Sequence, residues 1–363
     1  MPSNPARAAV FSGPTEGFDV REVDLPEPGP GEAIVRTSCC TLCRSDLHTF
    51  EGRREAPTPT TLGHEVLGHI SALHADDPPR DVSGQPLSKG DRVTWSIAVH
   101  CGTCYFCEQG LPQKCADLFK YGHAPVDGGR GPSGGLATHL HLRAGTSYVR
   151  VPQTLSDAVA CPANCATATA VAALRLSGGV AGKTVLVQGA GMLGLNACAL
   201  ANTGGAATVI AVDREPRARA RALSFGAHHA LGLLPPEELA EEVRAVSDGR
   251  GADVAVEMTG APEAIEAGLA ALRTGGTQIW VGSVMPTRSV ALDPETVTRR
   301  MLTVRGLHNY TPDDLVAAIE FLTQAVDRYP FEGLVGDVFE LGDVAAAFQR
   351  ALSSESPRIA VRP

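Results

Sequence analysis

The sequence lacks long hydrophobic runs, a secretory signal pattern and a surplus of basic residues. No stretch approaches the roughly 18 consecutive apolar residues that a membrane-spanning helix requires, which argues against a membrane protein. The opening residues, Met-Pro-Ser-Asn-Pro, lack the charged-then-apolar order of a signal peptide, so we expect a cytoplasmic protein. The formal net charge of −9 argues against a nucleic-acid partner, because phosphate binding depends on basic surface.

The length and composition indicate a globular protein of two domains. The 363 residues exceed the roughly 250–300 at which a single core stops growing. Ten cysteines in a long chain without a signal pattern indicate metal binding or catalysis and not disulfides. Cys39, Cys40 and Cys198 fall outside any ligand spacing, so we expect them to be small buried hydrophobic residues.

Two patterns of secondary structure divide the chain. Short strand-like runs separated by Pro and Gly over residues 6–38 predict a small, irregular β-barrel domain. An Ala-rich helix is predicted over residues 158–176. From residue 184 onward, apolar strands alternate with helices, which predicts right-handed crossovers and a doubly wound parallel sheet of the Rossmann type. The predicted fold class is therefore α/β.

Four closely spaced cysteines carry the most specific metal signal. Cys101, Cys104, Cys107 and Cys115 are separated by two, two and seven residues, so one short lobe can surround a tetrahedral Zn²⁺ with four thiolates. No position is left for water, and the site is therefore predicted to be structural. Redox cysteines or disulfides are the alternative, which a reducing compartment disfavours.

A second set of metal-binding residue types begins at Cys43 and continues at His64 and Glu65. A catalytic zinc ion needs three protein ligands and one open position. Cys43 and His64 supply two ligands, and either Cys161 or Cys165 supplies the third. Glu65 is expected to approach the metal or to take part in ligand exchange.

Three residues that follow Cys43 are candidates for supporting roles. Asp46 is placed to accept the second N–H of His64, the usual carboxylate support of a histidine ligand, although ordinary helix-end polarity would also explain it. Zinc lowers the pKa of a bound alcohol, and the released proton must leave a water-poor pocket. If a nucleotide cofactor lies beside the metal, the Ser45 hydroxyl, the ribose of that cofactor and His48 would carry the proton outward in turn.

A glycine-rich loop follows the predicted strand 184–188 and opens a helix. The loop contains Gly189, Gly191, Met192, Leu193 and Gly194. Amide N–H groups and the helix N-terminus of such a loop bind the pyrophosphate of a dinucleotide. Asp213, at the end of the next strand, can bind both adenosine ribose hydroxyls and repels a 2′-phosphate, so NAD is predicted. Arg214, Arg217 and Arg219 leave NADP as the weaker alternative.

The order and spacing of these motifs resemble the zinc-containing medium-chain dehydrogenases, the alcohol and sorbitol dehydrogenase family, over essentially the whole chain. The resemblance implies a GroES-like catalytic domain at residues 1–167, with a structural zinc lobe at about 100–116. It implies a Rossmann cofactor domain at 168–306 and a C-terminal segment, 307–363, that returns to the first domain. It also implies two zinc ions per subunit and a homodimer or homotetramer.

The resemblance also assigns individual residues. In alcohol dehydrogenases the ligand cysteine precedes a threonine by four positions, which favours Cys165, with Thr169, over Cys161. The sorbitol-type branch has a Glu near this point, and this sequence has none. The pattern Cys-x-Ser-x-x-His matches the family's proton relay of Ser45 and His48. The resemblance also implies that Thr169 binds the cofactor, that Arg44 and Arg358 pair with the pyrophosphate, and that backbone near Val281 meets the nicotinamide amide.

The sequence therefore predicts a zinc-dependent alcohol dehydrogenase that passes hydride between a small alcohol, or its carbonyl form, and NAD. Residues 110–115, 118–123 and 165–169 resemble a subfamily proposed to act in phosphonate metabolism, which suggests a hydroxyalkylphosphonate as substrate. Polyols and cyclitols are equally compatible. Candidate groups for an anionic substrate are Arg53, Arg54, Lys120, His123 and Arg130. A zinc-free quinone reductase and a non-catalytic NAD-binding zinc protein are the alternatives from other classes, and the complete ligand and relay sets argue against both.

Overall fold

The computed structural model describes residues 6–126 and 131–363, and it divides into two compact units. Of the described residues, the first unit comprises 6–126, 131–165, 311–326 and 331–363, and the second comprises 166–310 and 327–330. The chain passes from the first unit to the second after residue 165 and back after residue 310, close to the domain boundaries expected at 167 and 307. The C-terminal tail is interrupted, however, because residues 327–330 belong to the second unit. Tyr329 keeps the short segment 327–330 in the second unit, because its hydroxyl donates to Asn202 Oδ1 at 2.9 Å.

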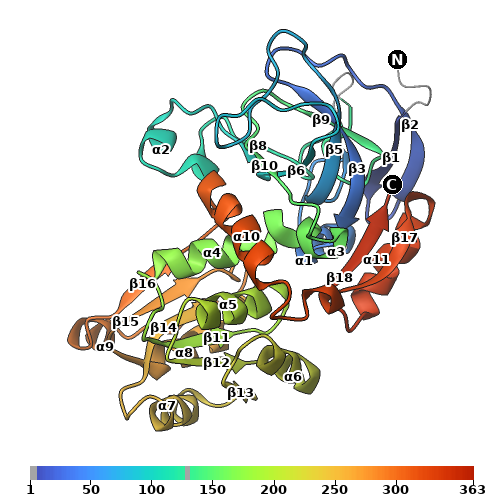
Figure 1. Ribbon diagram of the computed structural model, residues 1–363. Coiled ribbons are helices and arrows are strands. Elements are labelled where there is room, and N and C mark those ends of the chain that lie inside the picture. Colours follow the sequence, from blue (N-terminus) through green and yellow to red (C-terminus); the bar gives the residue numbers. More distant parts are fainter. Residues whose placement is uncertain (1–5, 127–130) are drawn as a thin grey trace. The chain divides into compact units, whose positions relative to one another are not determined.

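The described strands of the first unit form three β-sheets. Their strands are labelled in Figure 1. The three-stranded sheet has the order β2 (Gly17–Val23), β1 (Ala6–Gly13) and β4 (Thr60–Thr61). The seven-stranded sheet has the order β10 (Tyr148–Arg150), β6 (Arg92–Trp95), β5 (Glu65–Leu73), β3 (Ala33–Thr41), β18 (Arg358–Arg362) and β17 (Val335–Glu340), and β9 (His139–Leu142) also pairs with β3. The third sheet consists of β7 (Ala98–Val99) and β8 (Phe119–Lys120).

The last strand of the chain completes the largest sheet. β18 pairs antiparallel with β3, with Val361 opposite Cys40, and parallel with β17. The helices of this unit are α1 (Arg44–Phe50), α2 (Tyr105–Glu108), α3 (Asp157–Ala160), α10 (Pro312–Ala325) and α11 (Val344–Ser353). Residues from the C-terminal tail thus lie beside residues near position 40.

An aromatic cluster anchors α1 to the first unit. Phe50, in α1, packs against Phe11, Phe18 and Phe348, with ring centroids between 4.8 and 6.2 Å apart across the cluster. Phe11 and Phe348 are almost fully buried. Buried aromatic side chains contribute large apolar areas and favour tilted contacts. This packing fixes the short helix whose N-terminus carries Cys43.

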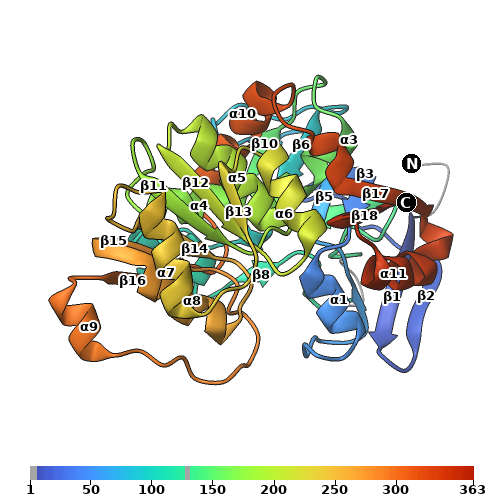
Figure 2. The same cartoon turned by 90° about the horizontal axis from the view of Figure 1, so that it is seen from below.

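The second unit contains the predicted doubly wound sheet. Its six strands are parallel, in the order β13 (His229–Leu231), β12 (Thr208–Val212), β11 (Thr184–Gln188), β14 (Ala252–Glu257), β15 (Leu272–Trp280) and β16 (Thr303–Gly306). Its helices are α4 (Ala166–Leu176), α5 (Met192–Thr203), α6 (Pro216–Ser224), α7 (Pro236–Ala245), α8 (Pro262–Ala271) and α9 (Pro294–Arg299). Figure 2 shows α5 and α6 on one side of the sheet and α7 and α8 on the other. The prediction of an α/β fold is confirmed.

The helix predicted over residues 158–176 is not continuous. α3 is followed by a 3₁₀ turn, Cys161–Asn164, and α4 begins only at Ala166. Pro162 lacks a backbone N–H, and Cys165 has φ −133° and ψ −72°, which no helical residue adopts. Among the described residues, no single helix is long and apolar enough to cross a membrane, and segments 157–164 and 166–176 reach that length only when counted together across their bend.

Candidate active site

The N-terminus of α1 places Cys43 and the side chain that supports His64. Cys43 has extended backbone angles, φ −83° and ψ 158°, and its N–H donates to Asp46 Oδ2 at 2.9 Å. The other oxygen, Asp46 Oδ1, lies 3.3 Å from His64 Nδ1 and accepts the N–H of Gly63 at 3.3 Å. One buried carboxylate therefore caps the helix and orients the imidazole, as outer partners of metal ligands do.

Four possible ligand atoms, from Cys43, His64, Glu65 and Cys165, lie within 4.8 Å of one another. The Sγ atoms of Cys43 and Cys165 are 3.9 Å apart. Two thiolates on a tetrahedral Zn²⁺, with Zn–S bonds of about 2.3 Å, would be separated by roughly 3.8 Å. The two thiols and the imidazole therefore fit a zinc ion with three protein ligands.

Cys161 does not point into this cluster. Its S–H lies 3.3 Å from the carbonyl oxygen of Cys39 and 3.2 Å from that of Glu65, and the side chain is fully buried. Burial, followed by the neighbouring thiol of Cys39, raises the pKa of Cys161 well above its usual value. The break in the helix brings Cys165, and not Cys161, to the ligand position beside Cys43.

The electrostatics of the cluster favour one thiolate even before a metal binds. The pKa of Cys43 is lowered well below its usual value, first by the hydrogen bond from Cys165 and, against the effect of burial, by Arg358 and His64. The pKa of Cys165 is raised by the same hydrogen bond and by burial. Burial acts to lower the pKa of His64, but Asp46 and then Cys43 raise it well above the usual value. Metal binding requires deprotonated ligands, and the lowered pKa of Cys43 favours the thiolate form of that one ligand.

A buried ion pair closes one side of the cluster. Arg358 Nε and Nη2 donate to the two carboxylate oxygens of Glu65, each at 2.7 Å, and Thr41 Oγ1 donates to Glu65 Oε2 at 2.6 Å. Arg358 Nη2 also lies 3.5 Å from Cys43 Sγ. Arg358 was expected at the cofactor pyrophosphate. The structure gives its guanidinium a different partner, because its donors are committed to Glu65, Cys43 and the carbonyl of Pro357.

Ser45 and His48 lie three residues apart in α1, and both are half-buried. Residues at this spacing share one face of a helix. His48 Nδ1 is buried and has no hydrogen-bond partner in the part of the chain that the structure describes. Burial, followed by the positive charges of Arg53 and Arg44, lowers the pKa of His48. This environment favours the neutral form of His48, which can accept a proton.

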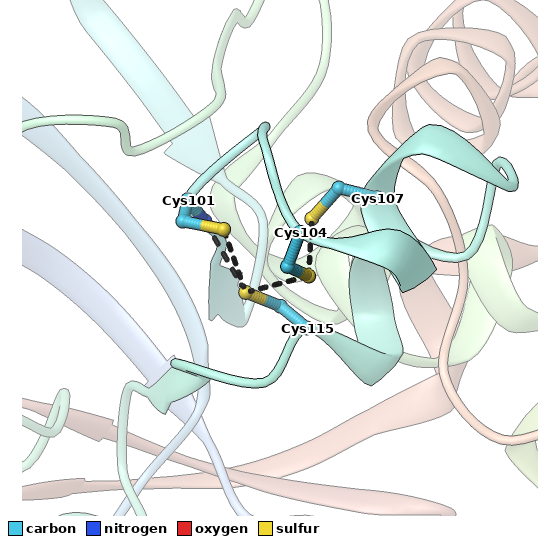
Figure 3. Close-up of side chains that lie close together, drawn as sticks. All are labelled: Cys101, Cys104, Cys107 and Cys115. Carbon is cyan, nitrogen blue, oxygen red and sulfur yellow. Dashed lines mark hydrogen bonds between the residues drawn. The ribbon is translucent and has the colours of Figure 1, made fainter.

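The four-cysteine lobe forms a second cluster. Figure 3 shows the four thiols turned toward one another, and their Sγ atoms all lie within 4.8 Å. The separations are 3.5 Å for Cys101–Cys115, 3.6 Å for Cys104–Cys107 and 3.9 Å for Cys104–Cys115. Backbone and side-chain donors, chiefly from Thr103, lower the pKa of Cys101 to about 6. The cluster fits a tetrahedral zinc ion without an open position.

The glycine-rich loop contains positions that only glycine can occupy without strain. Gly189 has φ +93°, and a Cβ at Gly194 would lie 1.7 Å from the carbonyl oxygen of Gly189. Asp213 follows β12, and its Oδ2 accepts the N–H of Ala190 at 2.7 Å while its Oδ1 accepts that of Glu215 at 2.9 Å. The carboxylate thus joins the glycine loop to the next turn, at the edge where dinucleotides bind in such sheets.

The other proposed cofactor contacts are distributed over both units. Arg214 is exposed and pairs with Glu215 at 3.3 Å. Val281 is buried, and its N–H donates to the carbonyl of Glu257 at 2.9 Å. Thr169 lies half-buried in α4, and Arg44 is exposed in the first turn of α1. Their roles in cofactor binding stay predictions.

Comparison with known proteins identifies the family. Residues 29–153 match the alcohol dehydrogenase GroES-like domain, and residues 193–324 match the zinc-binding dehydrogenase domain. L-threonine 3-dehydrogenase of Pyrococcus furiosus is 32% identical over 276 residues, which cover 74% of this chain and 73% of that protein. The chain belongs to the zinc-containing medium-chain alcohol dehydrogenase family.

Two further proteins are similar to the chain over almost its whole length. The 5-exo-hydroxycamphor dehydrogenase of Pseudomonas putida is 29% identical over 350 residues, which cover 95% of each chain. The crystal structure of an alcohol dehydrogenase from Thermotoga maritima superposes with a TM-score of 0.91, at 26% identity, and covers 99% of this chain and 100% of that one. The predicted GroES-like and Rossmann domains are thus confirmed.

One residue that holds the site was missed from the sequence. Asn164 is fully buried, and its Nδ2 donates to the carbonyl oxygens of His64 and Trp95, each at 3.0 Å. Its Oδ1 accepts the N–H of Val66 at 3.3 Å. A lone amide in the otherwise apolar run 158–166 was the available signal, because a buried amide in such surroundings needs partners. Asn164 ties the turn before Cys165 to the loop that carries His64.

Proposed function

We propose that this chain is a zinc-dependent dehydrogenase that transfers a hydride between an alcohol and NAD. The observation that supports this proposal most is the cluster of Cys43, His64 and Cys165. Its 3.9 Å thiol separation and its buried support from Asp46 match a three-ligand catalytic zinc site. A second, structural zinc ion would occupy the four-cysteine lobe. A cytoplasmic location and a homodimer or homotetramer are the accompanying predictions.

In the proposed mechanism, bound zinc would acidify the substrate hydroxyl and the nicotinamide would accept the hydride. The chain's own residues perform the remaining tasks. Asp46 keeps the ring of His64 oriented, and Arg358, held by Glu65, places a positive charge beside Cys43. Ser45 and His48, one helical turn apart, carry the hydroxyl proton outward.

The proposed substrate class is a polar alcohol, either a hydroxyalkylphosphonate or an uncharged polyol or cyclitol. The names of the relatives refer to threonine and to hydroxycamphor, and two such different compounds do not indicate one substrate class for this chain. Of the basic candidates for an anionic substrate, Arg130 lies outside the described residues. NAD is proposed over NADP because Asp213 places a carboxylate after β12 and because Arg214 is paired with Glu215.

Replacing His48 by glutamine is expected to lower kcat/KM for alcohol oxidation by about 10²-fold, the lower end of the range for a group that passes a proton. The base must be neutral to accept a proton, so wild-type activity should fall as pH drops through the pKa of His48. Because that pKa is lowered, the fall should lie below about pH 6.5, the value for free histidine. A pH profile of kcat/KM tests this, with the exposed His229→Gln as control. An unchanged profile in His48→Gln would remove His48 from the relay.

Replacing Asp213 by asparagine is expected to weaken NADH binding by about tenfold and to reduce the preference for NADH over NADPH. The amide keeps the shape of the side chain but loses the charge that repels a 2′-phosphate. Fluorescence titration with both reduced cofactors measures the change. A variant that retains the wild-type preference would show that another residue selects the cofactor.

The test of the proposed function is NAD⁺ reduction by the zinc-loaded protein with a panel of alcohols, polyols and hydroxyalkylphosphonates. We expect turnover with at least one class and its loss in Cys43→Ala. Turnover that is unaffected in Cys43→Ala would refute zinc-dependent catalysis at this cluster.

A further inference from the structure

A buried carboxyl group that the proposed mechanism does not use lies at the carboxyl end of β14. Glu257 is the last residue of this strand and is completely buried. Its Oε1 accepts the N–H and the hydroxyl of Thr259, each at 2.5 Å, and the N–H of Gly260 at 2.8 Å. Its Oε2 is also buried and has no hydrogen-bond partner in the part of the chain that the structure describes. One oxygen therefore holds the loop after β14, and the other is unsatisfied.

The backbone of Glu257 holds the loop after β15 as well. Its carbonyl oxygen accepts the N–H of Val281 at 2.9 Å and that of Gly282 at 3.0 Å. The two loops pack so closely that a Cβ at Gly282 would lie 2.6 Å from the backbone nitrogen of Thr259. Glu257 therefore fixes two neighbouring loops, residues 258–260 with its side chain and residues 281–282 with its main chain.

The loop after β14 lies against the glycine-rich loop, which has supports of its own. A Cβ at Gly189 would lie 2.7 Å from Cγ2 of Thr259, so the two loops are in contact. The N–H of Gly189 donates to the carbonyl of Val212 at 2.8 Å, and the N–H of Ala190 donates to Asp213 at 2.7 Å. The glycine-rich loop is therefore anchored to β12, independently of Glu257.

The order of the strands assigns the loops after β14 and β15 to one half of a dinucleotide. From β11 the chain continues to β12 and β13 on one side of the sheet and then to β14, β15 and β16 on the other. Dinucleotides bind across such a reversal, at the carboxyl ends of the strands. Asp213, the proposed partner of the adenosine ribose, follows β12. The nicotinamide half would therefore extend toward the ends of β14 and β15.

The surroundings of Glu257 favour the neutral acid. Burial raises the pKa of its carboxyl group, against the effect of the hydrogen bonds from Thr259 and Gly260. Negative charge on an oxygen that neither water nor a described residue contacts costs free energy. A carboxylic acid can carry its proton on Oε2 and still accept hydrogen bonds at Oε1. Glutamine has the same shape and the same acceptor, so it should replace Glu257 without loss.

We propose that Glu257 is a positioning residue for the nicotinamide half of the cofactor. It holds the loops 258–260 and 281–282 together and does not itself contact the reacting atoms. The inference rests on the proposed function for the identity of the cofactor. It adds that the adenosine half, bound after β12, is indifferent to Glu257, whereas the half that accepts the hydride depends on it.

The experiment compares the binding of NADH with that of ADP-ribose, which retains the adenosine and pyrophosphate groups but lacks the nicotinamide. Calorimetric titration of the zinc-loaded protein measures both dissociation constants. In Glu257→Ala we expect the Kd of NADH to rise at least about tenfold and that of ADP-ribose less than about twofold. Glu257→Gln should bind both ligands as the wild type does.

Asp253, near the opposite end of β14, provides the matched control. Its carboxylate accepts the N–H of Thr184 at 2.8 Å and pairs with Arg273 at 2.5 Å, so it also joins neighbouring strands, but at their amino ends. Asp253→Ala should lower the free energy of unfolding in urea and leave both dissociation constants within about twofold of the wild type. This comparison separates positioning of the cofactor from general loss of stability.

A milder variant covers the case in which Glu257→Ala does not fold. Thr259→Val removes one of the three donors to Oε1 and keeps the methyl group that faces Gly189. We expect it to raise the Kd of NADH by about threefold and to leave that of ADP-ribose unchanged. An unchanged Kd for NADH in Thr259→Val would overturn the positioning role.

Turnover with alcohols tests the proposed function separately. If no alcohol is oxidised but the difference between NADH and ADP-ribose appears, the positioning role stands and the proposed function fails. The positioning role would be overturned by an unchanged affinity for NADH in Glu257→Ala or by equal weakening of both ligands. A loss of NADH binding in Glu257→Gln or in Asp253→Ala as large as that in Glu257→Ala would overturn it as well.

Discussion

Replacing Cys165 by alanine is expected to reduce the zinc content from two ions per subunit to one and to lower kcat/KM for alcohol oxidation by at least about 10³-fold. The thiol lies 3.9 Å from that of Cys43, where a third ligand completes the set with His64. Loss of one of three ligands removes the metal that acidifies the hydroxyl. Elemental analysis and steady-state kinetics on the same preparation measure both effects.

Cys161→Ala is the matched control for this prediction, because Cys161 stands four residues away and is also buried. Its thiol contacts the carbonyls of Cys39 and Glu65 and not the cluster. We expect Cys161→Ala to keep both zinc ions and most of the activity, with a stability loss of about 1–2 kcal/mol from the small cavity. The opposite result, with zinc lost in Cys161→Ala and kept in Cys165→Ala, would reassign the third ligand.

Replacing Arg358 by methionine is expected to lower the free energy of unfolding by about 3–5 kcal/mol, because it leaves the carboxylate of Glu65 buried without its partner. Both side chains are almost fully buried and share two hydrogen bonds of 2.7 Å. Urea denaturation of the zinc-loaded protein measures the change. Arg362→Met is the control, because Arg362 lies exposed on the same strand and should contribute little.

A second substitution distinguishes loss of the ion pair from general disruption. In the double variant Arg358→Met with Glu65→Gln, the buried charge is gone, so we expect much of the lost stability to return. If Arg358→Met costs less than about 0.5 kcal/mol, the ion pair between β18 and Glu65 of β5 does not contribute the stability expected of a buried pair. If the double variant is less stable than Arg358→Met alone, the remaining charge is not the source of the loss.

The residues with local spacing could be predicted from the sequence. The four-cysteine lobe and the glycine loop are short segments in which spacing alone restricts geometry, and the structure brings both sets together. The alternation of strands and helices likewise predicted the parallel sheet of the second unit. Strands and helices differ in the spacing of their apolar residues, and this spacing can be read from short segments of the sequence.

Contacts between distant segments could not be predicted in this way. Arg358 and Glu65 are 293 positions apart, and the sequence gives no signal that β18 inserts beside β3. The resemblance placed Arg358 at the cofactor pyrophosphate, and its pairing with Glu65 is a contact that the sequence alone did not predict. The prediction of one helix over 158–176 was wrong for a different reason. The Ala-rich composition favoured a continuous helix in spite of Pro162. The break at Cys165 depends on tertiary contacts, such as the hydrogen bond from Asn164 to His64, which the local sequence does not reveal.

The most direct test of the account is the zinc content per subunit of the purified wild-type protein, measured together with NAD⁺ reduction on the alcohol panel. The account predicts two zinc ions and turnover, with one zinc ion and no turnover after Cys43→Ala. One zinc ion and no turnover in the wild type would leave only the four-cysteine lobe occupied and would contradict zinc-dependent alcohol oxidation by this chain.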